Sequence, residues 1–248
     1  PFLHNKFCIT RKTNVYIVTV PTPVFKNKNP NINALISATR SIKRLISKGD
    51  TIIYESTVYP GLIEEIAEKY ISQNNNFVLN EDFFLGYSPE RMNPGDNIHT
   101  LRNITKIISG SNSKTTNLLK NIYGKICNKI HIANSIKIAE SSKIIENVQR
   151  DINVALVNEF TQLFHKLNVP FKDVIEAAKT KWNFLNFTPG LVGGHCIGVD
   201  PYYLTFIAKK NNHIPKLILN GRSLNDNMYK YVSKRIFENL EKKYNSFD

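Results

Sequence analysis

Only three cysteines occur in the 248 residues, and they are scattered along the chain as Cys8, Cys127 and Cys196. They are too few and too far apart for a disulfide framework or a zinc cluster, so we expect no metal and a reducing, cytoplasmic setting. No run of about 18 consecutive apolar residues occurs, so no transmembrane helix is expected. The first residue is Pro1 rather than Met, and no signal-peptide pattern follows it.

Acidic residues are scarce relative to basic ones. The chain has 33 Lys and Arg against 20 Asp and Glu, a formal net charge of +13. This balance favours an anionic partner, such as nucleic acid, a membrane surface or a phosphorylated small molecule. The basic residues form no run and no arginine-rich arm, so we expect no nucleic acid and no membrane as partner. The hydrophobic content of 42% is ordinary for a globular protein with a buried core.

Short apolar segments alternate with helical spacing in the first half of the chain. Strand patterns cover 14–20, 51–54, 77–79, 105–110 and 129–132, and helical patterns cover 31–47, 60–72 and 113–126. This alternation predicts an α/β fold, with helices packed on a parallel sheet. Because ligands bind beyond the carboxyl ends of strands in such sheets, Thr22, Thr57 and Glu90 are candidate site residues.

Helical patterns dominate after residue 134. They predict one long helix over 135–166 and further helices over 171–179, 201–211 and 215–242, with a Gly-rich loop at 188–200. We therefore expect a domain boundary near residue 133, with an α/β domain over 1–133 and an all-α domain over 134–248.

The Gly-rich loop carries the densest signal of a site. Four glycines fall within the nine residues 190–198, which lets the backbone approach a ligand closely. Cys196 is a candidate nucleophile there, and Asp200 could reach the same pocket. The alternative is a tight turn with a buried structural cysteine. His195 adjoins Cys196 directly, so the two are not expected to pair as nucleophile and base.

Polar residues form a stripe along the predicted long helix. Glu140, Lys143, Asn147 and Arg150 fall within an arc of about 80°. Lys143 and Asn147 lie four residues apart, so both project from the same face and could stabilise an oxyanion. The alternative is a solvated helix face.

Two shorter segments each combine a strand end with polar groups. Thr57 lies in the segment 54–61, whose hydroxyls and free N–H groups suit a phosphate or a catalytic water, although such residues mostly cap helices. Glu90 lies in the segment 87–95 and could orient water or act as a base. The alternative for this segment is a surface turn rich in Pro and Gly.

Five motifs occur in the order that nucleotide-sugar 6-dehydrogenases have them. They are Val20-Pro21-Thr22-Pro23, Glu55-Ser56-Thr57-Val58-Tyr59-Pro60-Gly61, Ser88-Pro89-Glu90-Arg91, Lys143-xxx-Asn147 and Gly193-Gly194-His195-Cys196-Ile197-Gly198-Val199-Asp200-Pro201-Tyr202-Tyr203. Over essentially its whole length the chain resembles the branch that oxidises UDP-N-acetylhexosamines to uronic acids for bacterial surface polysaccharides.

The resemblance implies a four-electron oxidation of the sugar's primary alcohol by two NAD in succession. Cys196 would capture the aldehyde as a thiohemiacetal, which is oxidised to a thioester and hydrolysed. Lys143 and Asn147 match the residues that hold the oxygen of the tetrahedral species, and Asp200 matches the one that positions water or base. Glu90 matches an acid implicated in thioester hydrolysis.

The remaining site residues also follow from the resemblance. Thr57 would help to place the water and, with Thr22, would contact NAD. The UDP-sugar would be bound by Glu90, Arg91, Lys143, Asn147, Arg150 and Gly193.

Three departures from the family pattern modify this interpretation. The Gly-x-Gly-x-x-Gly turn that binds the NAD pyrophosphate is missing, and the sequence stops before the third domain that closes over UDP. Pro94 stands where relatives specific for UDP-glucose carry a second Glu, which resembles the acetamido-sugar branch. We therefore expect a fragment, with a partial Rossmann-like NAD-binding domain followed by a helical substrate-binding domain. That helical domain would form a homodimer through its long helix.

Two alternatives remain open at this point. The chain could be an inactive fragment that only associates through the long helix. It could also be a 6-dehydrogenase that acts on UDP-glucose or GDP-mannose.

Overall fold

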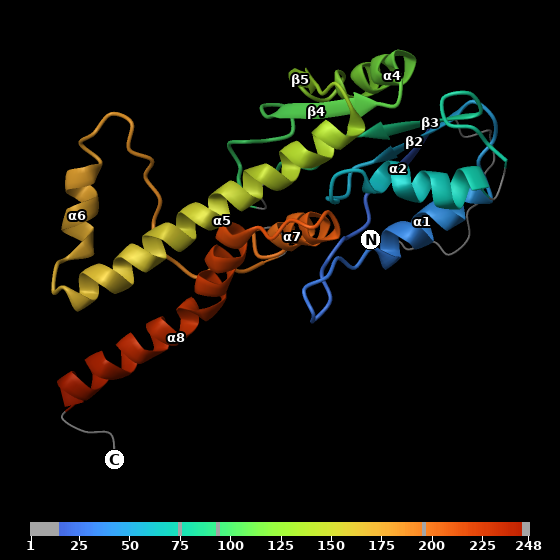
Figure 1. Ribbon diagram of the computed structural model, residues 1–248. Coiled ribbons are helices and arrows are strands. Elements are labelled where there is room, and N and C mark those ends of the chain that lie inside the picture. Colours follow the sequence, from blue (N-terminus) through green and yellow to red (C-terminus); the bar gives the residue numbers. More distant parts are fainter. Residues whose placement is uncertain (1–14, 74–75, 93–94, 195–196, 245–248) are drawn as a thin grey trace. The chain divides into compact units, whose positions relative to one another are not determined.

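The structure, a computed structural model, describes residues 15–73, 76–92, 95–194 and 197–244 (Figure 1). The chain divides into two compact units, the first ending at Ile144 and the second beginning at Ile145. The division falls inside the long helix α5 (Ile136–Lys166), whereas the predicted domain boundary near residue 133 precedes that helix.

In the described part of the first unit, five strands form a sheet in the spatial order β1-β2-β3-β4-β5. Their bounds are β1 Val15–Val18, β2 Asp50–Tyr54, β3 Phe83–Tyr87, β4 Thr105–Gly110 and β5 Lys129–Ile132. The pairs β1–β2, β2–β3 and β4–β5 are parallel, which confirms the predicted α/β class. The pair β3–β4 is antiparallel, so the sheet is mixed rather than parallel throughout.

The reversal at β4 has a simple origin in the connection that precedes it. The described residues between β3 and β4 contain no helix, and a parallel partner would need a long crossover. The reversal also determines where the next helix lies. Crossovers between parallel strands are right-handed. Because β4 and β5 run opposite to β1 and β2, the helix that connects β4 to β5 lies on the other face of the sheet from the helix that connects β1 to β2.

The helices of the first unit cover both faces of the sheet in this way. Helices α1 (Asn33–Lys43) and α2 (Leu62–Ala67) pack against each other (Figure 1), and one π-turn, η1 (Glu68–Ser72), continues α2. The hydroxyl groups of Thr39 on α1 and Tyr54 on β2 are hydrogen-bonded at 2.9 Å, which places α1 on the Tyr54 face. Helix α4 (Ser113–Tyr123) packs on the other face, where Ile53, Ile108, Leu119 and Tyr123 form one buried cluster.

The strand predicted at 77–79 is wrong. Leu79 makes only an isolated bridge to Phe83, and the Asp82 carboxylate accepts the N–H of Val78 at 3.0 Å, which closes a turn. The strand begins instead at Phe83. It contains Gly86, where an added Cβ would lie 2.8 Å from a methyl of Leu119, so the absence of a side chain lets α4 approach β3 closely.

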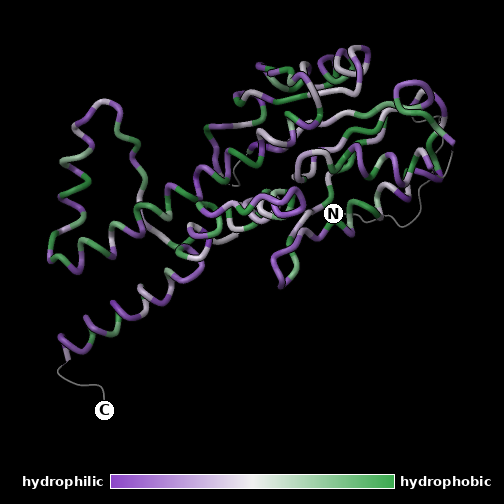
Figure 2. Tube along the Cα trace, in the orientation of Figure 1, coloured by the Kyte–Doolittle hydropathy of each residue, from purple (hydrophilic) through white to green (hydrophobic). Residues whose placement is uncertain are grey.

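The second unit is helical, as predicted. It contains most of α5 together with α6 (Phe171–Ala178), α7 (Asp200–Lys210) and α8 (Lys216–Tyr244). Helix α8 approaches α5 closely at Gly221, where an added Cβ would lie 2.6 Å from Cδ1 of Ile152. In Figure 2, hydrophobic and hydrophilic residues alternate along α6 and α8.

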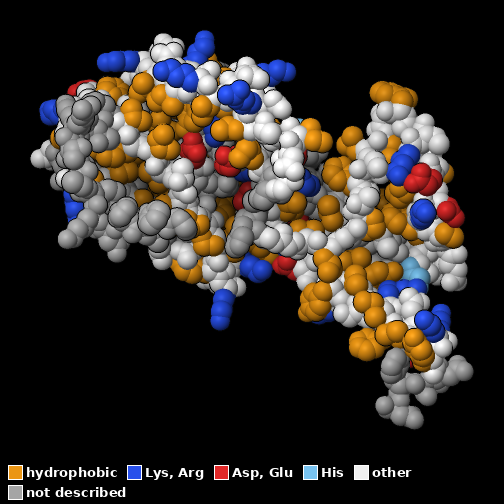
Figure 3. All heavy atoms as spheres, turned by 180° about the vertical axis from the view of Figure 1, so that it is seen from behind, with side chains coloured by type: hydrophobic (Ala, Val, Ile, Leu, Met, Phe, Trp, Pro, Cys, Tyr) orange, Lys and Arg blue, Asp and Glu red, His pale blue; other side chains and the backbone are white. Residues whose placement is uncertain are grey.

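Many large apolar side chains of the second unit are exposed (Figure 3). On α5, Leu156, Phe160 and Leu163 recur at helical spacing and are 48%, 38% and 48% exposed. These three residues form an apolar seam along one side of the helix. Among the described residues, no helix combines the length and the apolar character needed to cross a membrane.

Candidate active site

The three parallel strands β1, β2 and β3 end level with one another. Val18 pairs with Tyr54, and Tyr54 pairs with Tyr87, the last residue of β3. The predicted site residues Thr22, Thr57 and Glu90 follow these strand ends within four residues. They therefore leave the sheet at the same edge, where open α/β sheets bind ligands.

Hydrogen bonds join the loop that follows β1 to the loop that follows β2. The Thr22 hydroxyl donates to the carbonyl of Thr57 at 2.7 Å, and the Ser56 hydroxyl donates to the carbonyl of Val20 at 2.6 Å. Tyr87 donates its hydroxyl to the Ser56 carbonyl at 3.1 Å. The Thr22 hydroxyl thus fixes the position of the Thr57 backbone.

The backbone that follows Thr57 is hydrogen-bonded to a buried carboxyl group. Glu140 on α5 is fully buried and accepts the N–H groups of Gly61 at 2.5 Å and Ile63 at 3.1 Å, at the start of α2. Gly61 has a φ of 92°, a left-handed conformation that favours glycine. Burial raises the pKa of Glu140 to about 8. The hydrogen bonds from the two N–H groups lower this pKa, but the effect of burial is larger.

Glu90 is oriented by the backbone that follows it. Its Oε1 accepts the N–H groups of Arg91 at 2.7 Å and Met92 at 2.6 Å, and Oε2 lies 4.0 Å from the ammonium of Lys106. The Arg91 guanidinium donates to the carbonyl of Thr105 at 2.6 Å. The Glu90 side chain is 45% exposed, so one carboxylate oxygen is fixed while the group remains accessible to water.

Lys106 is a buried cation that the sequence analysis missed. Its side chain is 2% exposed, and its ammonium lies 3.9 Å from Oε1 of Glu55 and 5.3 Å from the centre of the Tyr123 ring. Tyr123 donates its hydroxyl to Glu55, and the pKa of Tyr123 is raised, chiefly by burial and also by Glu55. The position gave no signal because a lysine in a strand is usually exposed.

Asn147 and Asp200 meet in the second unit. Nδ2 of Asn147 donates to Oδ2 of Asp200 at 2.5 Å, and both side chains are buried. Asp200 begins α7, where a carboxylate is favoured by the helix dipole. Lys143 is also buried and precedes Asn147 by four residues on α5, and Arg150 is partly exposed.

The catalytic cysteine predicted from the sequence, Cys196, lies outside the described residues, as does His195. Gly193 and Gly194 are exposed, and an added Cβ would meet nothing within 4 Å at either one. Gly194 has a φ of 82°, so this turn favours glycine for conformational rather than steric reasons. Cys127 is buried and free, and Cys8 lies outside the described residues.

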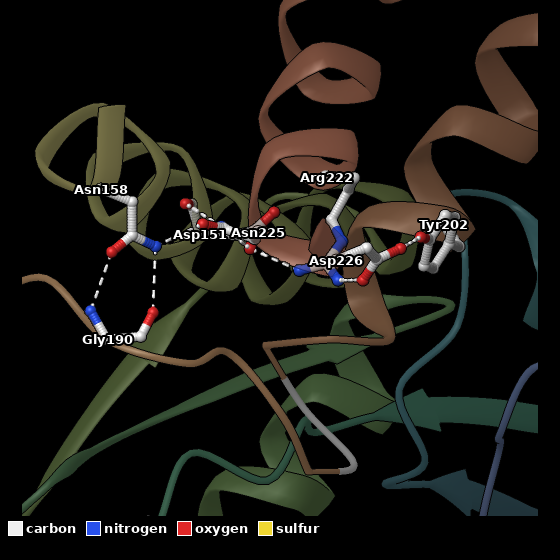
Figure 4. Close-up of polar contacts among 7 residues, drawn as sticks. All are labelled: Asp151, Asn158, Gly190, Tyr202, Arg222, Asn225 and Asp226. Carbon is white, nitrogen blue, oxygen red and sulfur yellow. Dashed lines mark hydrogen bonds and ion pairs between the residues drawn. The ribbon is translucent and has the colours of Figure 1, made fainter. Parts of the chain in front are cut away.

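A buried polar network beside this loop was missed (Figure 4). It consists of Asp151 and Asn158 on α5 and Arg222, Asn225 and Asp226 on α8, with Tyr202 on α7 and the backbone of Gly190. The stripe of polar residues on α5 continues through Asp151 to Asn158. This continuation is the sequence pattern that could have indicated a buried polar network. The partners on α8 lie more than 60 residues away and could not be inferred from spacing.

The side chains near these strand ends and in the second unit define the chemistry that is available. No group of three or more His, Cys, Asp or Glu side chains in the part of the chain that the structure describes could hold a metal ion. The available groups are instead hydroxyls, carboxylates, an ammonium and a carboxamide. These groups can orient a substrate, stabilise an oxyanion and transfer protons.

Known proteins share this organisation. Residues 6–127 match the NAD binding domain of the UDP-glucose/GDP-mannose dehydrogenase family, and residues 137–227 match its central domain. The chain belongs to the UDP-glucose/GDP-mannose dehydrogenase family. This confirms the resemblance inferred from the five motifs.

Individual members of the family are similar over nearly the whole chain. UDP-N-acetyl-D-glucosamine 6-dehydrogenase of Salmonella typhi is 48% identical over 234 residues, 94% of this chain and 55% of that protein. Protein CapL of Staphylococcus aureus is 46% identical over 233 residues, with the same two shares. The structure of a UDP-D-ManNAc dehydrogenase from Pyrococcus horikoshii matches with a TM-score of 0.84 at 34% identity, covering 93% of this chain and 54% of that one. The chain spans about half the length of the curated relatives it matches.

The edge formed by β1, β2 and β3 fits the NAD that the family implies. The three strand ends are level, and the loops after β1 and β2 are fixed to each other through Thr22 and Ser56. A dinucleotide needs such a rigid edge with backbone groups facing it.

Proposed function

We propose that the protein oxidises the primary alcohol of a UDP-N-acetylhexosamine to the uronic acid, in the cytoplasm and for surface polysaccharide biosynthesis. The observation that carries the proposal is the hydrogen bond between Asn147 and Asp200. It joins the amide that would hold an oxyanion to the carboxylate that follows Cys196 by four residues. Family membership supports the reaction class, and the names of the similar proteins support the acetamido-sugar substrate.

Cys196 would carry the substrate between two oxidations. NAD, when bound, accepts a hydride in each of them. The Cys196 thiolate adds to the aldehyde carbon and forms a thiohemiacetal, whose oxidation gives a thioester. Covalent attachment keeps the reactive aldehyde from escaping before the second oxidation.

Lys143 and Asn147 would stabilise the oxygen of the tetrahedral species. Both side chains are buried, where a charge–dipole interaction is less screened by water than at the surface. The Asn147 amide has two N–H groups, and one of them donates to Asp200, which orients the other. Asp200 would accept a proton from the thiol or from water.

Glu90 and Thr57 would direct water to the thioester. The backbone N–H groups that bind Oε1 of Glu90 fix the carboxylate, which in its charged form can accept a proton from water. Hydrolysis then breaks the C–S bond, releases the uronic acid and returns the thiol. Arg91, Arg150 and Gly193 would complete the binding of the UDP-sugar.

A direct assay tests this proposal. The chain is incubated with NAD and UDP-N-acetylglucosamine or UDP-N-acetylgalactosamine, and NADH formation is followed. We expect formation to be lost in Cys196→Ser and kept in Cys127→Ser, a matched control whose cysteine is buried in the first unit. Unchanged turnover in Cys196→Ser would contradict the mechanism.

The same assay decides between the alternatives. Faster turnover of UDP-glucose or GDP-mannose would assign the other substrates of the family. If no sugar is oxidised and NAD does not bind, the chain is a fragment that only associates.

We also propose a homodimer through the long helix. The apolar seam of Leu156, Phe160 and Leu163 is exposed in the single chain, and a second copy would bury it. We expect Phe160→Glu to convert a dimer into a monomer in sedimentation at micromolar concentration, whereas Glu159→Gln on the same helix should leave the dimer intact. A monomeric parent chain at that concentration would contradict this assembly.

A further inference from the structure

The Gly-rich segment of the second unit is attached to α5 near both of its ends. At one end, Nδ2 of Asn158 donates to the Gly190 carbonyl at 3.0 Å, and the Gly190 N–H donates to Oδ1 of Asn158 at 2.9 Å (Figure 4). At the other end, Asn147 donates to Asp200. One helix therefore fixes the entry and the exit of the segment 190–200.

Helix geometry sets the distance between these two attachments. Asn147 and Asn158 are eleven residues apart, which is about three turns, so they lie within about 20° of each other and about 16 Å apart along the axis. A segment of ten residues can extend to about 35 Å, roughly twice that span. The length of the chain alone therefore does not fix the ends of the segment, and the two attachments do.

The orientation of the Asn158 carboxamide is fully determined. Its side chain is completely buried, and Nδ2 also donates to Oδ1 of Asn225 at 2.9 Å. Asn225 in turn donates to the carbonyl and the carboxylate of Asp151 at 2.9 and 2.8 Å. Rotating the Asn158 amide by half a turn would set N–H against the Gly190 N–H and oxygen against two acceptors, so the network selects one orientation.

Arg222, Asp151 and Asp226 form the charged part of the network, which we call the anchor. Nη1 of Arg222 donates to Oδ1 of Asp151 at 2.6 Å, and Arg222 also pairs with Asp226, which accepts the Tyr202 hydroxyl at 2.7 Å. Arg222 and Asp151 are both buried, and breaking such a pair leaves an uncompensated charge. The anchor therefore keeps α5, α7 and α8 in one arrangement around Asn158.

We infer that Asn158 is a positioning residue, whose carboxamide holds the Gly190 backbone and so fixes the start of the Gly-rich segment, six residues before Cys196 in the sequence. Asn158 touches neither substrate nor cofactor in this role. The inference rests on the proposed function only for the role of Cys196. The attachment of Gly190 itself is independent of that function.

Recognition of Gly190 involves its backbone alone. An added Cβ at Gly190 would meet nothing within 4 Å. Gly190→Ala should therefore keep both hydrogen bonds and serve as a silent control. Asn158→Asp keeps an acceptor for the Gly190 N–H but replaces the amide donor with an oxygen that faces the Gly190 carbonyl and Asn225.

Amide hydrogen exchange of the intact chain measures the attachment directly. In Asn158→Ala we expect exchange at Gly190 to accelerate on the order of tenfold or more, because both of its hydrogen bonds are lost. Exchange in the middle of α8 should change much less. Asn153→Ala is the matched control, since the Asn153 amide donates to the Gln149 carbonyl of its own helix.

Reactivity of Cys196 is the second measurement. The pH profile of its alkylation by iodoacetamide should shift in Asn158→Ala and in Asn158→Asp, and kcat should fall more than KM changes. Protonation of the introduced carboxylate at low pH restores one donor, so Asn158→Asp should recover slow exchange at Gly190 as the pH falls. A general loss of packing would give no such recovery.

The outcomes separate this inference from the proposed function. Unchanged exchange at Gly190 in Asn158→Ala overturns the inference, and so does equal acceleration throughout the second unit in both Asn158 variants. If Cys196→Ser abolishes NADH formation while Asn158→Ala changes neither kcat nor the alkylation profile, the inference fails and the proposed function stands. If Cys196→Ser retains activity, the proposed function fails, and exchange at Gly190 still tests the attachment.

Discussion

Replacing Glu140 with Gln should remove a specific pH dependence of stability. Burial raises the pKa of Glu140 to about 8 from 4.5. Between these values the folded chain keeps the proton and the unfolded chain has lost it, so the free energy of unfolding falls as the pH rises. Below 4.5 both states are protonated, and above about 8 both are ionised, so this contribution is flat outside the window.

The magnitude follows from the width of that window. Each pH unit within it lowers the free energy of unfolding by about 1.4 kcal/mol, which gives an upper limit of about 5 kcal/mol across the full range. Glu140→Gln carries no titrating group and resembles the protonated carboxyl in shape. The stability advantage of the parent chain over this variant should therefore shrink between about pH 5 and pH 8.

Urea unfolding followed by circular dichroism at several pH values measures this difference. Glu159→Gln, an exposed carboxylate on the same helix, is the control and should leave the pH dependence unchanged. Parallel curves for Glu140→Gln and the parent chain would refute the raised pKa. An advantage that grows with pH would show that the N–H groups of Gly61 and Ile63 hold the ionised form instead.

Three further changes test the packing of the first unit. Gly110→Ala should lose about 3 kcal/mol, because its Cβ would lie 2.5 Å from a backbone nitrogen. Gly86→Ala should lose less, since the nearest atoms belong to a side chain that can rotate, and equal losses in urea unfolding would contradict this. Lys106→Met should cost about 1–3 kcal/mol, because Glu55 and Glu90 lose the ammonium that lies about 4 Å from each, and an unchanged urea midpoint would oppose the ion-pair account. Burial raises the pKa of Cys127, so iodoacetamide should label it only on unfolding, and rapid labelling of the native chain would count against that burial.

Strong periodicity made most of the helical elements predictable. The apolar spacing over 135–166, uninterrupted by Gly or Pro, predicted α5 to within one residue. Strand β3 was missed because Gly86 breaks its apolar pattern, and the turn at Asn80 follows an apolar triplet that resembled a strand. In both places tertiary packing overrode the local pattern.

Within one helix, spacing predicts which candidate site residues share a face. The spacing of Lys143 and Asn147 predicted a shared face but left a solvated helix face as the alternative, and their shared role followed from the family resemblance. The role of Asn158 was not predictable, because its partners Gly190 and Asn225 lie 32 and 67 residues away. Buried polar networks join distant segments, and pattern within one segment carries no information about them.

The central claim is that Cys196 holds one sugar through two successive oxidations. The number of NADH molecules formed for each UDP-N-acetylhexosamine consumed tests it most directly. The account predicts a ratio of two, with the uronic acid as product and no aldehyde released into solution. A ratio of one with free aldehyde accumulating, or a ratio of two that persists in Cys196→Ser, would contradict it.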